Sequence, residues 1–212
     1  MTAPISTRVA QDMITEIERS FGDESHVQLK VNDILRWINS GQLEIINKNP
    51  ILKAISTTPG IKDQTAYDIP ADCIQMEMIQ VNNVILRACS WEEVRDITLA
   101  GPASSQPQVW SIYANKAFIY PAPDKDENIT IYYAKRPTDV TSAGDPLSIP
   151  DRYYDRLKEY IMSRAYEMDE DWTAHQVQRD QFESNLLALT NAESNVQGPY
   201  LVAMDSEYEG SW

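Results

Sequence analysis

The chain has 212 residues, of which 42% are hydrophobic and 24% charged, as is usual for a globular protein with a sizeable core. With 32 acidic and 18 basic residues, its formal net charge is −14. This balance argues against a protein that grips nucleic acid through a basic surface, because such binding needs cations that displace phosphate counterions. No apolar run reaches the roughly 18 residues that span a bilayer, and the N-terminus lacks the pattern of a signal peptide. We therefore expect neither export nor membrane contact.

The first 50 residues carry two helical patterns. Apolar residues recur at helical spacing from Thr7 to Ser20, and they recur again from Val31 to Asn47. Ser6 or Thr7 is expected to cap the first helix, and Gly22 suits a left-handed end.

The second helical pattern contains one glycine and several amide side chains, which are unusual within an apolar helix. Gly41 costs a helix about 1 kcal/mol relative to alanine, so we expect another helix to approach closely at this position. Asn39, Gln42 and Asn47 lie within or beside the apolar face, where buried amides require hydrogen-bond partners.

From residue 51 onwards the apolar pattern changes to a period of two, which predicts strands. Ser90 and Glu93 have the spacing of a capping box, and predict a short helix that ends near Leu99. The predicted strands and turns are Ile51–Thr58, a turn at Pro59-Gly60, Thr65–Ile69, Ile74–Val81, a turn at Asn82-Asn83, Val84–Leu86, Val109–Tyr113, a turn at Asn115-Lys116, Ala117–Tyr120 and Ile129–Lys135.

The segment from Ile149 to Leu189 predicts two helices joined by an acidic elbow at Asp169–Asp171, with Asp171 as the N-cap of the second. A linker rich in Thr, Ser, Gly and Pro precedes it. We therefore predict an α+β protein in which both ends of the chain build a four-helix bundle around an inserted antiparallel β module. The predicted parts are residues 1–50 and 147–193 for the bundle, 51–146 for the β module and 194–212 for an extended C-terminal tail.

The residues suited to metal binding are few and badly spaced. Cys73 and Cys89 are predicted to be reduced, buried thiols, and neither His26 nor His175 has a cysteine or histidine at ligand spacing. We predict no metal and no cofactor.

One segment imitates a calcium-binding loop. Asp124, Asp126 and Asn128 match its first ligands, but Ile129 replaces the required glycine and Lys135 replaces the final glutamate. We predict a solvated turn. Because no phosphate-binding or nucleophile motif is present, we assign no catalytic residue. A hydrolase using dispersed carboxylates is a weaker alternative, which would need a carboxylate pair with shifted pKa values in a cleft.

Aromatic residues are candidates for protein contacts. The tyrosines of the strands and helices are expected to pack in the core, because stacking on nucleic acid is normally accompanied by a positive groove. From Asp180 to Trp212 there is no basic residue and there are six acidic ones, which is typical of an interaction arm or a solvated terminus. Since tyrosine and tryptophan anchor interfaces, the candidate interface residues are Tyr200, Leu201, Tyr208, Trp212, Trp110 and Tyr113.

Several motifs occur together in a recognisable order. The helix Asp33–Asn39 continues to Gln42 in the form Trp-Ile-Asn-x-x-Gln, Tyr67–Asp72 ends a strand with Ile-Pro-Ala-Asp, and Ile119–Pro123 closes a hairpin. Ile149-Pro150 then begins the C-terminal helix pair. Together these stretches resemble the head-to-tail adaptor (connector) family of tailed, especially short-tailed, bacteriophages.

This resemblance implies a non-enzymatic virion protein of the neck or tail, assembled in the host cytoplasm. It implies a homo-oligomeric ring, commonly of twelve copies, between the portal protein and a tail or nozzle protein, with a channel for the genome. Twelve copies would carry −168 formal charges, so we expect DNA to pass without being specifically bound. The alternative is a soluble acidic interaction module that joins no particle.

Overall fold

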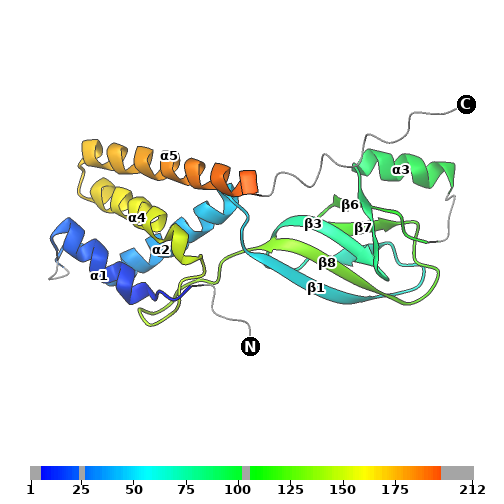
Figure 1. Cartoon of the computed structure of the whole chain (residues 1–212). Helices are drawn as coiled ribbons and strands as arrows, with labels where there is room; N and C mark the ends of the chain where they lie inside the picture. Colours follow the sequence, from blue (N-terminus) through cyan, green and yellow to red (C-terminus); the bar gives the residue numbers. More distant parts are fainter. Residues whose placement is uncertain (1–5, 24–26, 102–105, 197–212) are drawn as a thin grey trace, which may run out of the picture. The chain divides into compact units, whose positions relative to one another are not determined.

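The computed structural model describes residues 6–23, 27–101 and 106–196, and these residues form five α-helices and two β-sheets (Figure 1). The chain divides into two compact units, residues 1–49 with 137–212 and residues 50–136. The described regular elements of the first are helical, and the second contains both sheets and one helix. The predicted α+β fold class is therefore confirmed.

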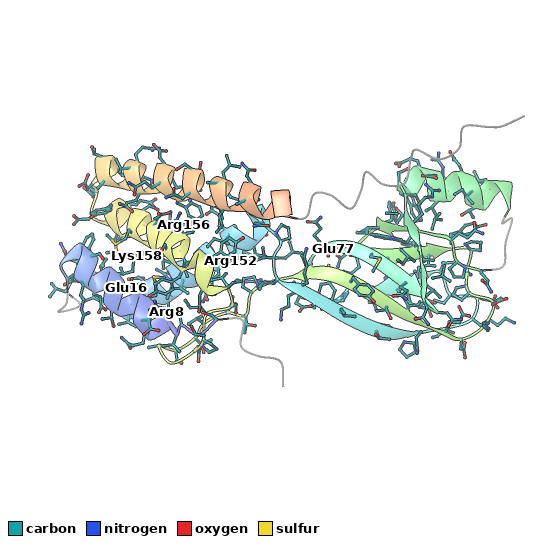
Figure 2. The ribbon with its side chains drawn as sticks, viewed as in Figure 1. Arg8, Glu16, Glu77, Arg152, Arg156 and Lys158 are labelled. Atoms are coloured by element: carbon teal, nitrogen blue, oxygen red, sulfur yellow. The ribbon has the colours of Figure 1, made fainter. Side chains whose placement is uncertain are left out.

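In the helical unit, α4 is the element that contacts the other helices. It packs against α1, α2 and α5, and α1 also packs against α2; Figure 1 shows α4 between α1 and α5. An ion pair between Glu16 Oε2 and Lys158 Nζ, 3.5 Å apart, supplements the apolar contact of α1 with α4 (Figure 2). The elements are α1 (Ala10–Phe21), α2 (Val31–Lys48), the 3₁₀ turn η1 (Asp151–Tyr153), α4 (Tyr154–Met168) and α5 (Trp172–Val196).

The start of α1 differs from the prediction. The helix begins at Ala10 with Val9 in the N-cap position, and the Asp12 carboxylate accepts the Val9 N–H at 3.1 Å. Ser6 and Thr7 were expected to cap this helix, but their hydroxyls donate to the Asp151 carboxylate at 2.6 and 2.5 Å. Both hydroxyls therefore make hydrogen bonds, as short polar side chains at a helix start were expected to do. Their acceptor is not the backbone of α1 but the carboxylate of Asp151, which lies 144 residues or more away along the chain.

Asp151 makes the stability of this contact dependent on pH. Hydrogen bonds from Ser6, and then from Thr7, hold the pKa of its carboxyl below the ordinary value. A lowered pKa in the folded state means that the contribution to stability is complete above the unfolded pKa of about 4 and is lost as the pH falls through the folded pKa. We expect Asp151→Asn to lower the melting temperature at pH 7 and to make the unfolding curve less dependent on pH below about 4. Thermal unfolding at a series of pH values measures this, and equal acid sensitivity of the two proteins would contradict it.

Side chains of α2 fix the connection that leads from the β-unit to α4. Asn39 donates to the Val140 carbonyl at 2.9 Å and accepts the Val140 N–H at 2.7 Å. The fully buried Gln42 accepts the Ser148 N–H at 2.6 Å. The prediction that these amides need partners is confirmed for Asn39 and for the carbonyl oxygen of Gln42, whereas Gln42 Nε2 is buried without a partner among the described residues and Asn47 is exposed. The two confirmed partners explain why residues 137–149, although they lack regular structure, belong to the helical unit.

The predicted close approach at Gly41 is also confirmed. A Cβ atom at this position would lie 2.6 Å from Leu157 Cδ1 and 2.7 Å from Tyr160 Cδ1, closer than atoms pack. Glycine therefore allows α2 and α4 to pack with their backbones close together. The left-handed end of α1 at Gly22, with φ 88°, is as predicted.

The β-unit consists of two four-stranded sheets and one helix. One sheet has the strand order β1-β8-β3-β4 and the other β2-β7-β6-β5, and a shared core joins residues of both. All strand pairs are antiparallel except β5 with β6. The elements are β1 (Lys53–Gly60), β2 (Ala66–Asp68), β3 (Cys73–Val81), β4 (Val84–Ile85), β5 (Arg87–Ala88), α3 (Trp91–Ala100), β6 (Val109–Tyr113), β7 (Lys116–Tyr120) and β8 (Glu127–Lys135).

The first predicted hairpin is wrong. Pro59 and Gly60 lie inside β1, which pairs with β8, whereas the following strand β2 pairs with β7 in the other sheet. A Cβ atom at Gly60 would lie 2.5 Å from the Glu127 carbonyl oxygen, so this glycine permits close strand pairing rather than a turn. A period of two identifies a strand, but it does not identify the neighbour with which the strand pairs.

The other turns lie at or beside their predicted positions. Asn82 and Asn83, with φ 46° and 66°, connect β3 to β4 as predicted. The turn between β6 and β7 consists of Ala114 and Asn115, with φ 48° and 58°, one residue before the prediction. Left-handed backbone at two successive positions matches the twist of a tight hairpin.

The predicted N-caps of α3 and α5 are confirmed in their main contacts. Ser90 Oγ accepts the Glu93 N–H at 3.2 Å, but the Glu93 carboxylate pairs with Arg87 at 2.5 Å instead of returning to the cap. At the elbow between α4 and α5, Asp171 Oδ1 accepts the Ala174 N–H at 3.0 Å, as expected of an N-cap.

Candidate interaction surfaces

Of the six predicted interface residues, four lie outside the described part of the chain, one is buried and one is exposed. Tyr200, Leu201, Tyr208 and Trp212 lie outside the described residues. Trp110 is 6% exposed and belongs to the core of the β-unit, where it stabilises the fold rather than offering a contact surface.

Tyr113 is the exposed member of this set. It is 51% exposed and stacks on Trp91 of α3, with the ring centroids 4.5 Å apart and the planes at 12°. The edge of Phe118 lies against Trp91 at 4.8 Å. The three rings hold α3 against β6 and β7, and about half of the Tyr113 side chain remains exposed.

The residues considered for chemistry serve structural contacts instead. Within residues 6–23, 27–101 and 106–196, no group of three or more His, Cys, Asp or Glu residues could hold a metal ion. Cys73 and Cys89 are free and half-buried, and burial raises the pKa of both thiols. In the segment that imitates a calcium loop, Asp126 accepts the Lys62 N–H at 2.9 Å and Glu127 pairs with Lys125 at 3.1 Å, beside a polar hollow of about 370 Å³.

Shifted carboxyl pKa values likewise have a structural cause. Burial between α4 and α5 raises the pKa of Glu159, which accepts a hydrogen bond from Asn185 at 2.9 Å and pairs with Arg156 at 3.1 Å. Hydrogen bonds from Thr141 and Ser142 lower the pKa of Asp145, which holds the turn before η1. Glu159 links α4 to α5, and Asp145 closes a turn within the 137–149 connection.

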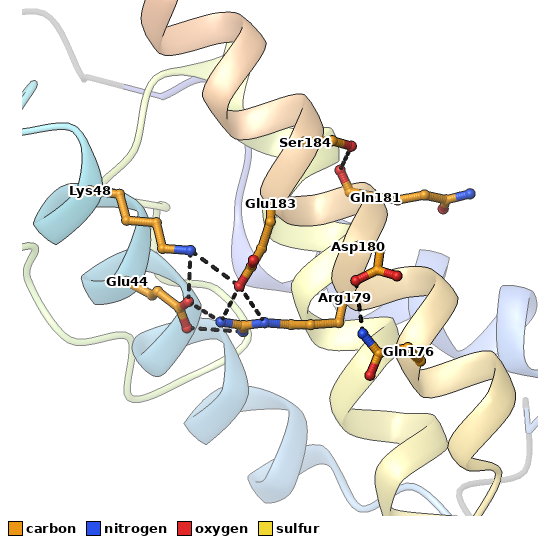
Figure 3. A network of polar contacts seen from close by, with 8 residues as sticks. All are labelled: Glu44, Lys48, Gln176, Arg179, Asp180, Gln181, Glu183 and Ser184. Carbon is orange, nitrogen blue, oxygen red and sulfur yellow. Dashed lines mark hydrogen bonds and ion pairs between the residues drawn. The ribbon is translucent and has the colours of Figure 1, made fainter.

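A network of charged side chains attaches α5 to α2 (Figure 3). The Arg179 guanidinium binds both oxygens of Glu44, with its Nη1 3.2 Å and its Nη2 2.5 Å from them. It also binds Glu183 at 3.0 Å, and Lys48 lies between the two carboxylates at 3.5 and 3.4 Å. The nearby Lys48, and to a smaller extent Arg179, lower the pKa of Glu183.

We expect Arg179→Met to lower the free energy of unfolding by about 1 kcal/mol, because a bidentate, half-buried pair is lost while the aliphatic contact is kept. The cost is expected to shrink in 1 M salt, which screens exposed charges. Arg95→Met is the matched control, because Arg95 pairs with the adjacent Asp96 on an exposed helix surface. Urea unfolding at low and high salt measures both variants, and an equal cost for both would contradict the role of the network.

Three large apolar side chains of α5 are exposed among polar ones. Trp172 is 63% exposed, Val177 50% and Leu187 61%, although the opposite face of the same helix packs against α4. These three side chains are spread over about 140° of the helix circumference, and singly exposed apolar side chains are common on protein surfaces.

Charge is divided unequally between the two units. The helical unit contains 10 basic and 22 acidic residues, a net charge of −12, whereas the β-unit contains 8 basic and 10 acidic residues, a net charge of −2. In the described part of the chain, no helix is long and apolar enough to cross a membrane.

Within the described residues, polar and charged side chains hold helices and connections together, and no cluster of metal-ligating residues occurs. A comparison with known protein families identifies the class of protein to which the chain belongs. Residues 9–203 match the family described as SU10 adaptor protein, and because the match covers most of both units, the chain belongs to this family. No curated protein matches the chain.

The chain is therefore a bacteriophage structural adaptor protein, a component of the virion that interacts with other phage structural proteins. The resemblance of the sequence to phage adaptors is confirmed at this level. Asn39, Gln42 and Gly41, which lie in the helix that carries part of the resemblance, act in the packing of α2 against α4 and against the 137–149 connection.

Proposed function

We propose that the protein is a head-to-tail adaptor that forms a ring, of twelve copies, between the portal and the tail or nozzle of a short-tailed phage. The observation that carries this proposal is the family match across residues 9–203. In the ring, α1, α2, α4 and α5 form a four-helix bundle that packs against neighbouring copies and the portal. The genome enters and leaves through the central channel.

The charge of the chain suits such a channel. The helical unit alone has a net charge of −12, and twelve helical units would carry −144. Acidic walls repel phosphate, so DNA would slide past them instead of binding by counterion release.

The parts of the chain that meet other proteins are proposed from their aromatic residues. Loops of the β-unit, together with exposed Tyr113 at the end of β6, meet tail components. The C-terminal residues 194–212 act as a docking arm on a neighbouring copy or the portal, with Tyr200, Leu201, Tyr208 and Trp212 as anchors.

Electron microscopy of negatively stained protein tests the proposal, with the protein imaged alone and after mixing with the portal of the same phage. Rings on the portal are expected. A chain that lacks residues 197–212 is expected to dock on the portal more weakly, and unchanged docking would contradict the arm.

The charge also suits the alternative function, a soluble acidic interaction module with no role in a particle. In that case, the protein remains a monomer or dimer when it is mixed with portal, and it binds a soluble partner instead. This outcome would contradict the adaptor ring.

A further inference from the structure

The sheet β1-β8-β3-β4 has one face in the core of the β-unit and one face turned outward (Figure 1). Residues directly opposite one another on neighbouring strands lie on the same face. Ser56, Ile131 and Ile79 are opposite one another, and both isoleucines belong to the core, so the next residues along each strand point outward. The outward residues are Ile55, Thr57 and Pro59 of β1, Asn128, Thr130 and Tyr132 of β8, Met78 and Gln80 of β3, and Ile85 of β4.

None of these nine outward residues is charged, although 24% of the chain is. Ile55, Tyr132 and Met78 are opposite one another and form an apolar row across three strands. At one end of the face, Lys53 and Glu77 form an ion pair and add no net charge (Figure 2). Few charges, with aromatic residues and methionine, are typical of the centre of a protein–protein contact.

No described residue covers the centre of this face. Ile55 is 63% exposed and Ile85 64%. The other sheet differs, because α3 lies against its outward side through the contacts of Trp91 with Tyr113 and Phe118. The occupant of the open face therefore comes from outside the described part of a single copy.

The open face has the size of a short peptide rather than of a folded partner. Its strands lie about 4.8 Å apart and the seven residues from Lys53 to Pro59 extend about 20 Å, so the face offers roughly 300–400 Å². A stable contact between two folded proteins takes about 800 Å² from each partner. Six residues in an extended conformation span about 20 Å, which is the length of this face.

One segment outside the described residues has the matching composition. Residues 199–204 are Pro, Tyr, Leu, Val, Ala and Met, and none is charged. The family match continues beyond α5, which ends at Val196, to residue 203, and so includes nearly all of this segment. Asp205, Glu207 and Glu209 follow it. Without these three acids the helical unit still has a net charge of −9, whereas the β-unit has −2, so the β-unit repels the end of the chain less.

We propose that residues 199–204 of one copy lie on the outward face of the β1-β8-β3-β4 sheet of an adjacent copy, with Tyr200 against the apolar row. This inference rests on the proposed ring and its C-terminal arm, and it names the surface that receives the arm. Because the arm and the face belong to the same chain, each copy gives one arm and receives another. Such a head-to-tail contact can continue from copy to copy until the ring closes.

Photo-cross-linking in the full-length chain tests this contact. p-Benzoylphenylalanine in place of Tyr200 keeps an aromatic side chain there, and its benzophenone group inserts into neighbouring C–H bonds, those of methionine above all. Rings are assembled from an equal mixture of unlabelled and nitrogen-15-labelled copies, alone and with portal, then irradiated and digested for mass spectrometry. The expected cross-link joins position 200 to Met78 or its neighbours on the face. Peptide pairs of mixed isotope are expected, because only two different copies produce them.

Charge in the contact is expected to abolish the cross-link. Ile55→Lys places a cation in the apolar row and is expected to lower the yield about tenfold or more, while the mostly exposed position lets the chain fold. Leu201→Asp in the arm is expected to have the same effect. Leu99→Lys is the matched control, because Leu99 is 81% exposed on α3, outside the face, and its substitution is expected to leave the yield unchanged. Circular dichroism checks that each variant is folded.

The outcomes separate this contact from the ring itself. Rings in which position 200 gives no cross-link, or links only to portal, to its own copy or to another surface of the neighbour, would overturn the contact and leave the ring intact. Equal yields in Ile55→Lys, Leu201→Asp and Leu99→Lys would also overturn it. If the unaltered chain forms no ring, alone or with portal, the proposed function fails, and the contact between copies fails with it.

Discussion

Replacing Phe182 by alanine is expected to lower the free energy of unfolding of the helical unit by about 3–5 kcal/mol. Phe182 is fully buried, and its ring lies edge-on to Tyr160 of α4 with the centroids 5.5 Å apart. Lys48 and Arg179 each lie 5.3 Å from the ring centre, so the same side chain also supports the charged network. Leu186 is the other fully buried side chain in the described part of α5. Losing one of two such anchors is therefore expected to loosen the whole helix.

Chemical denaturation measures the stability of this variant, and hydrogen exchange shows where the loss occurs. Exchange is expected to rise along α5 more than along α1, because α1 retains its own contacts with α2 and α4. Leu187→Ala is the control, since it removes an exposed apolar side chain of the same helix and is expected to lower the free energy of unfolding by less than about 0.5 kcal/mol. A Phe182→Ala protein as stable as this control would show that α5 is attached by other contacts.

Gly41→Leu is expected to destabilise the same unit by about 3 kcal/mol, because its side chain has to enter space that α4 occupies. Even the single methyl of Gly41→Ala would overlap Leu157 and Tyr160, which are both buried and cannot move into solvent. The gain in helix propensity, about 1 kcal/mol, offsets only part of that overlap, so a net loss of about 1–2 kcal/mol is expected for alanine.

Ser40→Ala is the matched control for the glycine. Ser40 is exposed on the same helix, so alanine is expected to be neutral or slightly stabilising there. Thermal unfolding of the three variants orders them, and a Gly41→Ala protein more stable than wild type would contradict the close contact between α2 and α4.

Much of the helical unit could be predicted because its determinants are local. The spacing of apolar residues predicted where most of the helices lie, although α5 runs to Val196, seven residues beyond the predicted end at Leu189. Gly22 and Asp171 marked an end and a start through backbone and capping rules. Gly41 predicted a close helix contact and Gln42 predicted a buried hydrogen-bond partner. The pattern did not identify these neighbours, which are α4 and Ser148. The resemblance to phage adaptors could be stated for the same reason, because the motifs that carry it are short local signatures.

The β-unit shows where local rules stop. Pro59-Gly60 has the composition of a turn, yet it continues β1, because pairing with β8 is decided by residues about 70 positions away. Trp110 is of a residue type that anchors interfaces, yet it lies in the core among residues of both sheets. Three successive residues of β6, Val109, Trp110 and Ser111, are buried, so a period of two does not predict this burial.

The sequence by itself determined the class of the protein, the positions of its helices and most strands, and an acidic composition that disfavours binding to phosphate. The tertiary structure decided which strands pair, which hydroxyls meet Asp151 and which face of α5 lies exposed. The physical reason is that spacing fixes which residues share a face of an element, whereas the partner of that face depends on segments brought together only by folding. For α5 this distinction is clear, because spacing identifies the apolar side of the helix, whereas only the tertiary structure shows that α4 is its partner.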